Sequence, residues 1–113
     1  MTTPIYDFVK SYAESDTVRG HMPGHKGINY YKGKAAGSEI SAAFPYDITE
    51  IKSADSLFEA DGIIAESERN AAELFGTYAT FYSAGGSTLC IQAMLAVCAK
   101  QGDKIIVARN SHK

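Results

Sequence analysis

The sequence has few of the features that mark a secreted, membrane-spanning or nucleic-acid-binding chain. Its N-terminus has no basic segment followed by an apolar block, so no signal peptide is expected. The longest apolar stretch, residues 89–99, is interrupted by Gln92 and is too short to span a bilayer. The net charge is only −2 and the 11 basic residues are scattered, which argues against nucleic acid or a membrane as a partner.

Cysteine is also scarce, and the two cysteines cannot pair with each other. Cys90 and Cys98 both fall on one expected helix, whose rise separates them by roughly 12 Å. That separation is too long for a disulfide. We interpret both as reduced core residues of a cytoplasmic protein.

The composition is that of a globular domain, with 45% apolar and 21% charged residues among 113. The expected helix at residues 89–100 is apolar nearly all round, which is typical of a helix buried inside a larger protein. The run at residues 104–108 is continuously apolar, like a strand covered on both faces of a parallel sheet. Two strands cannot bury such faces, so we expect the opening of a longer α/β protein.

Local signals predict an N-terminal helical arm and a long loop. Thr3 followed by Pro4 starts a helix over about residues 4–14. Residues 18–57 have an irregular pattern, and a loop of that length is usually functional or wraps another part of the structure.

A second helix and a βαβ unit are expected after this loop. The helix covers about residues 63–75 and ends at Gly76. The elements that follow form one right-handed βαβ unit. They are a strand at 78–82, a glycine turn, the helix at 89–100, a turn at 102–103 and a strand at 104–108.

The glycine turn, Gly85-Gly86-Ser87-Thr88, is the most informative segment. The first turn of a helix has unpaired N–H donors and the positive end of the helix dipole, and the two hydroxyls add further donors. Glycines also let the backbone approach an anion closely. The turn therefore predicts a phosphate site. The alternative is an ordinary strand-to-helix turn with Ser87 as the N-cap.

Two histidines in the long loop, His21 and His25, are spaced as metal ligands on a helix would be. Pro23 and Gly24 between them argue against a helix, and no carboxylate or cysteine lies nearby at ligand spacing. We expect no metal site here, but a rigid turn that presents polar side chains.

The acidic loop at residues 47–50, together with Asp55, has three open interpretations. It could supply a general acid or base, it could form the rim of a cation site, or it could consist of solvated carboxylates.

Residues 109–113 follow the second strand, at the sheet edge where open α/β sheets place their ligands. His112 would lie at the same edge as the glycine turn, and histidine can stack on an aromatic ring. A phosphorylated heteroaromatic cofactor would satisfy both features. The alternative is an incidental terminal histidine.

Taken together, these segments resemble the start of the large domain in the bacterial ornithine/lysine/arginine decarboxylases, which use pyridoxal phosphate on the aspartate-aminotransferase fold (fold type I). The matching segments occur in the family's order with comparable spacing. They are residues 23–27, 47–50, 72–76, 83–88, 102–104 and 109–113.

The resemblance implies roles for individual residues. Gly86, Ser87, Thr88 and the amide of Leu89 would form the cofactor-phosphate turn. His112, the expected catalytic residue, would stack on the pyridine ring. The turn departs from the family pattern at three positions: many members have asparagine where this chain has a glycine, and smaller residues where it has a leucine and a cysteine. These positions are Gly85, Leu89 and Cys90.

Lys113 follows His112, and the family holds its Schiff-base lysine in a Ser-X-His-Lys sequence. Here Asn110 stands two residues before His112, and the segment directly follows the first βαβ unit. Both facts match an earlier His-Lys of the family. The Schiff-base lysine and the acidic partner of the pyridine nitrogen are therefore expected downstream.

The resemblance also implies a fold and a function. Residues 1–57 would form a helix and loop arm, and residues 58–113 the start of a mostly parallel sheet of the large domain. The full protein would be a cytoplasmic decarboxylase of lysine, arginine or ornithine in polyamine metabolism, and a homodimer or larger homo-oligomer. We expect this chain alone to be inactive. Alternatives are another fold-type I lyase or aminotransferase, and a truncated, non-catalytic interaction module.

Overall fold

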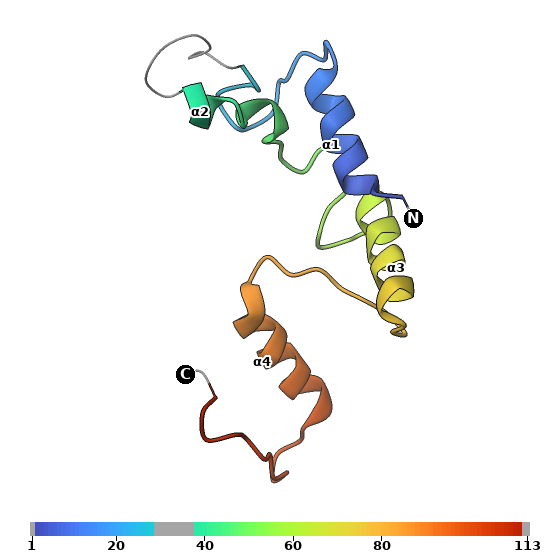
Figure 1. Cartoon of the computed structure of the whole chain (residues 1–113), viewed down its shortest axis with the longest axis vertical. Helices are drawn as coiled ribbons and strands as arrows, with labels where there is room; N and C mark the ends of the chain where they lie inside the picture. The colour runs from blue at the N-terminus through green and yellow to red at the C-terminus, as the bar shows by residue number, and fades with distance from the viewer. Residues whose placement is uncertain (1, 29–37, 112–113) are drawn as a thin grey trace. The chain divides into compact units, whose positions relative to one another are not determined.

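The computed structural model describes residues 2–28 and 38–111 (Figure 1). It divides into two compact units, one ending at Tyr82 and the other beginning at Ser83. None of the described helices combines the length and apolarity needed to cross a membrane. The helices are α1 (Pro4–Glu14), α2 (Ser38–Ser41), the 3₁₀ turn η1 (Phe44–Tyr46), α3 (Ile63–Phe75) and α4 (Gly86–Cys98).

Helix α1 covers the predicted residues. Pro4 occupies its first turn, and Thr3 is the N-cap, although the threonine hydroxyl makes no capping hydrogen bond. The Thr3 backbone N–H instead donates to the Asp7 carboxylate at 3.2 Å. One side of α1 is apolar, and the helix contacts both α3 and η1 within the first unit (Figure 1).

Helix α3 also has the predicted bounds, and its end is set by Gly76. This glycine has a left-handed backbone conformation with φ of 62°. Its N–H donates to the Glu73 carbonyl at 3.2 Å, and the Thr77 N–H donates to the Ala72 carbonyl at 3.0 Å. These two bonds satisfy carbonyl groups that the helix leaves free at its C-terminus.

Side chains of α3 hold both ends of the first unit. The Thr2 hydroxyl donates to Glu66 at 2.9 Å, and the Asn70 amide donates to the Thr2 carbonyl at 3.0 Å. At the other end, the Tyr82 backbone N–H donates to the Glu68 carboxylate at 2.7 Å. Most side chains stay partly open to solvent. Of those described, Arg19 and Ser41 are buried, and no apolar side chain is.

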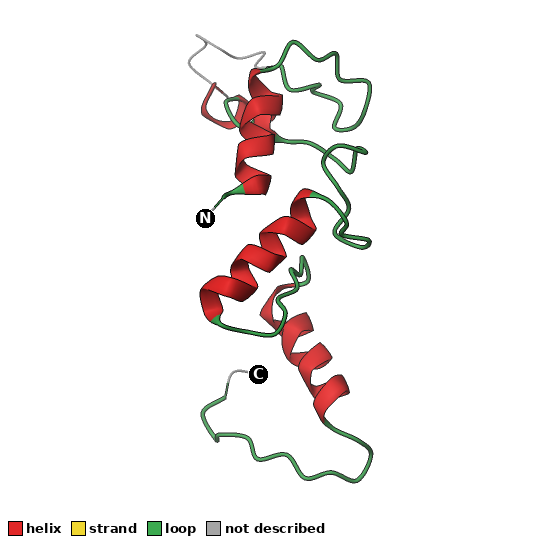
Figure 2. Cartoon of the chain, turned by 90° about the vertical axis from the view of Figure 1, so that its right-hand side faces the viewer, coloured by secondary structure: helices red, strands yellow, loops and turns green. Residues whose placement is uncertain are grey.

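The expected strands do not form, so the predicted α/β class and βαβ unit are not seen among the described residues. Residues 78–82 and 104–108 are irregular, and Figure 2 shows only helix and loop. A strand gains its backbone hydrogen bonds from a neighbouring strand. These two segments lie in different units, and neither pairs with another strand among the described residues.

Helix α4 forms, but it begins three residues before the predicted start. Its apolar side chains are exposed; Val97, for example, is 86% exposed. Cys90 and Cys98 are free thiols that are exposed, so our expectation of core cysteines is wrong for this structure. The reason is that residues 83–111, the described part of the second unit, contain no other helix and no sheet to cover α4. The predicted turn after α4 is confirmed by Gly102, which has φ of 96°.

Candidate functional site

The glycine turn forms the N-terminal end of α4. Gly85 is the N-cap, Gly86 begins the helix with a positive φ of 68°, and no side chain caps the helix. Ser87 and Thr88 are therefore in its first turn, and both are exposed. Their hydroxyls have no hydrogen-bond partner in the described part of the chain. The alternative in which Ser87 is the N-cap is thus wrong, and the turn presents unpaired N–H and O–H donors.

Leu89 explains why position 85 is a glycine. A Cβ added at Gly85 would lie 2.4 Å from Cδ2 and 2.8 Å from Cβ of Leu89. Because Leu89 Cβ is fixed to the helix backbone, the leucine could not simply swing away. The glycine at 85 and the large side chain at 89, both departures from the family pattern, are therefore coupled by packing.

The loop after α1 and the segment at 47–50 are joined through His25. Its Nε2 lies 3.1 Å from Oδ2 of Asp47, and its ring stacks on Phe44 with centroids 4.1 Å apart and planes at 7°. The Gly27 N–H donates to Nδ1 of His25 at 3.0 Å. An N–H group can only donate, so Nδ1 is the acceptor and Nε2 carries the proton shared with Asp47.

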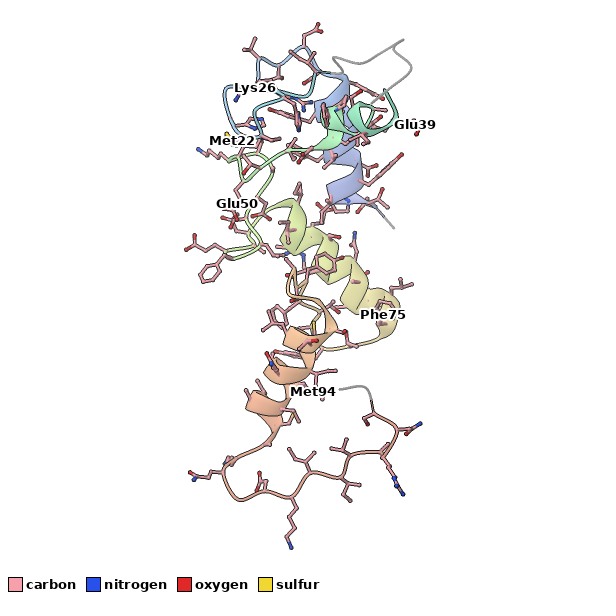
Figure 3. All side chains as sticks on the ribbon, turned by 90° about the vertical axis from the view of Figure 1, so that its left-hand side faces the viewer. Met22, Lys26, Glu39, Glu50, Phe75 and Met94 are labelled. Atoms are coloured by element: carbon pink, nitrogen blue, oxygen red, sulfur yellow. The ribbon has the colours of Figure 1, made fainter. Side chains whose placement is uncertain are left out.

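His21 has different partners. Its Nδ1 hydrogen-bonds to the Met22 carbonyl, so Nδ1 carries the proton. Its Nε2 then accepts from the Tyr12 hydroxyl at 2.8 Å. Lys26 Nζ donates to the His21 carbonyl at 2.5 Å, and Figure 3 shows Lys26 and Met22 on the loop after α1. The two histidines thus fix the predicted polar turn. Nowhere in residues 2–28 and 38–111 do three or more metal-ligating side chains gather.

Asp55 has a structural role at the start of α3. Its carboxylate accepts from the backbone N–H groups of Ser56, Asp61, Gly62 and Ile64, at 2.8 to 3.2 Å. Desolvation of the carboxylate raises the pKa of Asp55, but the four hydrogen bonds outweigh this effect and hold the pKa well below its ordinary value. Asp55 therefore fits neither a general acid or base nor the rim of a cation site, because its carboxylate already accepts hydrogen bonds from backbone N–H groups.

Sequence reasoning overlooked several of these contacts. Arg19 was not singled out, yet it is buried, with its guanidinium over the Tyr12 ring at 4.7 Å. Phe44 was also overlooked. Asp55 carried no local capping signal, because it stands eight residues before the first residue of α3 and its bonds to Asp61, Gly62 and Ile64 depend on the path of the loop. His112 and Lys113 lie outside the described residues, so their predicted positions stay predictions.

Comparison with known proteins identifies the family. The family model described as "Orn/Lys/Arg decarboxylase, major domain" matches residues 3–113. The chain belongs to this family. The Orn/Lys/Arg decarboxylase match includes the glycine turn, the His25–Asp47 pair and Asp55, so all three lie in the family's major domain.

Curated relatives give the same result. The chain is 36% identical to an arginine decarboxylase of Bacillus subtilis over 116 residues, which are 98% of this chain and 23% of that protein. It is also 36% identical to an arginine decarboxylase of Halalkalibacterium halodurans, again over 98% of this chain and 23% of the relative. An ornithine decarboxylase of Haemophilus influenzae is 26% identical over the whole chain, which covers 16% of it. The chain thus spans less than a quarter of each of these relatives. No solved structure matches.

Proposed function

We propose that residues 1–113 form the opening part of a pyridoxal-phosphate-dependent decarboxylase of a basic amino acid. The observation that carries this proposal is the uncapped first turn of α4, with free hydroxyls on Ser87 and Thr88, in a chain of the decarboxylase family. Arginine is the first substrate to test, because the two relatives at 36% identity are named arginine decarboxylases and one at 26% is named an ornithine decarboxylase.

The turn fits the phosphate of the cofactor. The N–H groups at the start of α4 point along the helix axis without a capping side chain, and the positive end of the helix dipole favours an anion there. Gly86, Ser87, Thr88 and the amide of Leu89 would hold the phosphate, and His112 would stack on the ring. When bound, pyridoxal phosphate supplies the electron sink for the charge left by loss of carbon dioxide. The contribution of these residues is to bind and orient the cofactor.

The rest of the protein completes the fold. In a protein as long as the relatives, further strands pair with residues 78–82 and 104–108, and a fold-type I sheet covers α4. Residues 1–57 then form an arm and residues 58–113 the start of the large domain. The enzyme acts in the cytoplasm on a small amino acid as a homodimer or larger homo-oligomer. Residues 1–113 alone are inactive, because the Schiff-base lysine lies downstream.

Two other functions use the same turn. Another fold-type I lyase or an aminotransferase would bind the cofactor similarly, but the segments at residues 23–27 and 47–50 favour a decarboxylase. A non-catalytic interaction module would need neither cofactor nor substrate. Assaying a full-length protein with arginine, lysine and ornithine separates the three, because a decarboxylase releases carbon dioxide, an aminotransferase forms a 2-oxo acid, and a module does neither.

Cofactor titration of a full-length protein tests the phosphate turn. Ser87→Ala combined with Thr88→Ala removes both hydroxyl donors. Each lost hydrogen bond to a charged group is worth about 1.5–3 kcal/mol, so the dissociation constant should rise at least about tenfold. Ser11→Ala is the control, since that hydroxyl bonds within α1 to the Phe8 carbonyl. Unchanged cofactor affinity in the double variant would refute the proposed turn.

Borohydride reduction followed by peptide mapping tests the placement of residues 112–113. The reduced cofactor label should map to a lysine downstream of residue 113. A label on Lys113 would show that residues 109–113 have been matched to the wrong His-Lys of the family. Removal of His112 should slow decarboxylation more than it weakens cofactor binding, because a stacked ring orients the cofactor without holding it covalently.

A further inference from the structure

The loop after α1 contains two cations, Arg19 and Lys26, that form no ion pair with a carboxylate of the described residues. Arg19 Nη2 donates to the Tyr12 carbonyl at 3.3 Å, and Lys26 Nζ donates to the His21 carbonyl. Both partners are uncharged main-chain oxygens. The ion pair found in the described residues joins His25 to Asp47 and includes neither cation. Asp16, three residues before Arg19, is exposed and forms no ion pair with either cation in the described structure, and the sequence contains no other Asp or Glu before Glu39 on this loop.

Arg19 is buried as well as unpaired. Its exposed fraction is 9%, and its Nη1 atom is shielded from solvent without a hydrogen-bond partner among the described residues. The Tyr12 ring beneath the guanidinium offsets part of the lost hydration. Burying a charge without a counter-ion is costly, and arginine cannot become neutral by losing its proton. Arg19 therefore lacks an anionic partner for Nη1.

Gly27 lies directly against this guanidinium. A Cβ at position 27 would lie 2.3 Å from Nη1 of Arg19, so the space is available only because residue 27 has no side chain. The turn at Gly27 therefore covers Nη1 with backbone alone. Binding of an anion at Nη1 therefore requires the turn at Gly27 to move.

We propose that Arg19 and the adjoining turn form an oxyanion-binding site, made of other residues than the proposed cofactor turn at the start of α4. Nη1 carries two N–H groups without an acceptor, and each can donate a charge-assisted hydrogen bond to an anionic oxygen of a carboxylate or a phosphate. Lys26, next to Gly27, adds a second positive charge to the same loop. Asp47 does not fill this role, because its carboxylate is bonded to His25.

Hydrogen–deuterium exchange read by mass spectrometry tests this site on the whole chain at micromolar concentration. The probes are inorganic phosphate and acetate, with chloride at the same ionic strength as the reference. Exchange in the peptide that covers residues 18–28 should slow saturably, by about tenfold at an anion concentration ten times the dissociation constant. A response to phosphate alone, to acetate alone or to both identifies the oxyanion. The peptide containing Ser87 and Thr88 reports separately on the cofactor turn, so failure of one site is told apart from failure of the other.

Three variants make the test specific. Arg19→Gln should abolish the slowing, whereas Arg69→Gln, the same change at an exposed arginine of α3, should leave it intact. If Arg19→Gln unfolds the loop, Arg19→Lys keeps the charge without the planar fork and should weaken anion binding by about 10- to 100-fold. The proposal is overturned if chloride slows exchange equally, if the slowing follows protein rather than anion concentration, or if Arg19→Lys binds as tightly as the original chain.

Discussion

The helices of the two units differ in how their apolar side chains are distributed and in whether another helix packs against them. Helices α1 and α3 each have one apolar side, and within the first unit they contact each other. Helix α4 is apolar on nearly all sides, and the described residues of the second unit include no other helix or strand to pack on it. A helix with one apolar side needs one neighbour, whereas α4 needs neighbours all around it. The apolar pattern sets how much cover a helix requires, and the rest of the chain determines whether that cover exists.

The largest effect is expected from substitutions on α4 that replace its exposed apolar side chains. Met94 and Val97 are 55% and 86% exposed, and lie one turn apart on the helix (Figure 3 labels Met94). We expect the original chain to self-associate and to bind a dye for apolar surfaces. Changing both residues to lysine should weaken self-association at least about tenfold, because burying each side chain is worth about 1.5–3 kcal/mol. Sedimentation velocity measures this.

The matched control for α4 lies in the first unit. Tyr6 and Leu74 are 65% and 64% exposed, and changing both to lysine should affect self-association much less. An equal effect of the two pairs would show that α4 is not the associating surface. A monomeric original chain that unfolds cooperatively and binds no dye would contradict the prediction for both units.

Gly27→Ala should be the most destabilising of the single changes in the first unit. Gly27 has φ of 73°, which costs a residue with a side chain about 1–2 kcal/mol. The added Cβ would also displace the Arg19 guanidinium. Gly24→Ala is the control, since nothing lies within 4 Å of its added Cβ, and it should change stability by less than about 0.5 kcal/mol. Urea unfolding followed by circular dichroism compares them, and similar midpoints would contradict the assigned role of Gly27.

Asp55→Asn should have an intermediate effect that depends on pH. The pKa of Asp55 is lower in the folded chain than in the unfolded one, where an aspartate has a pKa of about 3.9. Its contribution to stability is therefore complete above pH 4 and is lost as pH falls further. Asp55→Asn should flatten this acid-side loss in urea unfolding, whereas Glu59→Gln, an exposed change in the same loop, should not. Identical pH profiles for both variants would count against the Asp55 contacts.

The smallest effect is expected for Asp47→Asn. The Asp47 side chain is 59% exposed, and the contribution of exposed pairs of this kind is at most about 1 kcal/mol and falls with salt. The stacking of His25 on Phe44 should keep the loop in place. Urea unfolding at low and high salt checks this, with Glu39→Gln as the control. A loss as large as that of Gly27→Ala would mean that Asp47 has further partners.

Features set by neighbours in sequence could be predicted. Thr3 and Pro4 located the start of α1, and Gly76 located the end of α3, because caps and stops act within a few residues. The turn at Gly102 was predicted for the same reason. The glycine turn was recognised as a helix start, but α4 begins at Gly86 because a glycine with positive φ can open a helix directly.

Features that depend on distant partners could not be predicted. The His25–Asp47 contact joins residues 22 positions apart within an irregular loop, and no periodic pattern marks it. Residues 78–82 have the composition of a strand, but composition does not supply the neighbouring strand that would pair with them. The burial of Arg19 without an ion pair could not be predicted from the sequence either, because the burial of a single arginine depends on the fold of the loop around it.

The hydrogen bond between α3 and Thr2 also affects when the first unit can fold during synthesis. The Thr2 carbonyl is bonded to a side chain 68 positions later, so this bond and the contact of α1 with α3 cannot form until α3 has been made. At ribosomal rates of about 5–20 residues per second, this delay is roughly 3–14 s. An isolated helix as short as α1, which has 11 residues, is marginal in water over that time. The side of α1 that contacts α3 therefore stays uncovered by α3 for seconds during synthesis.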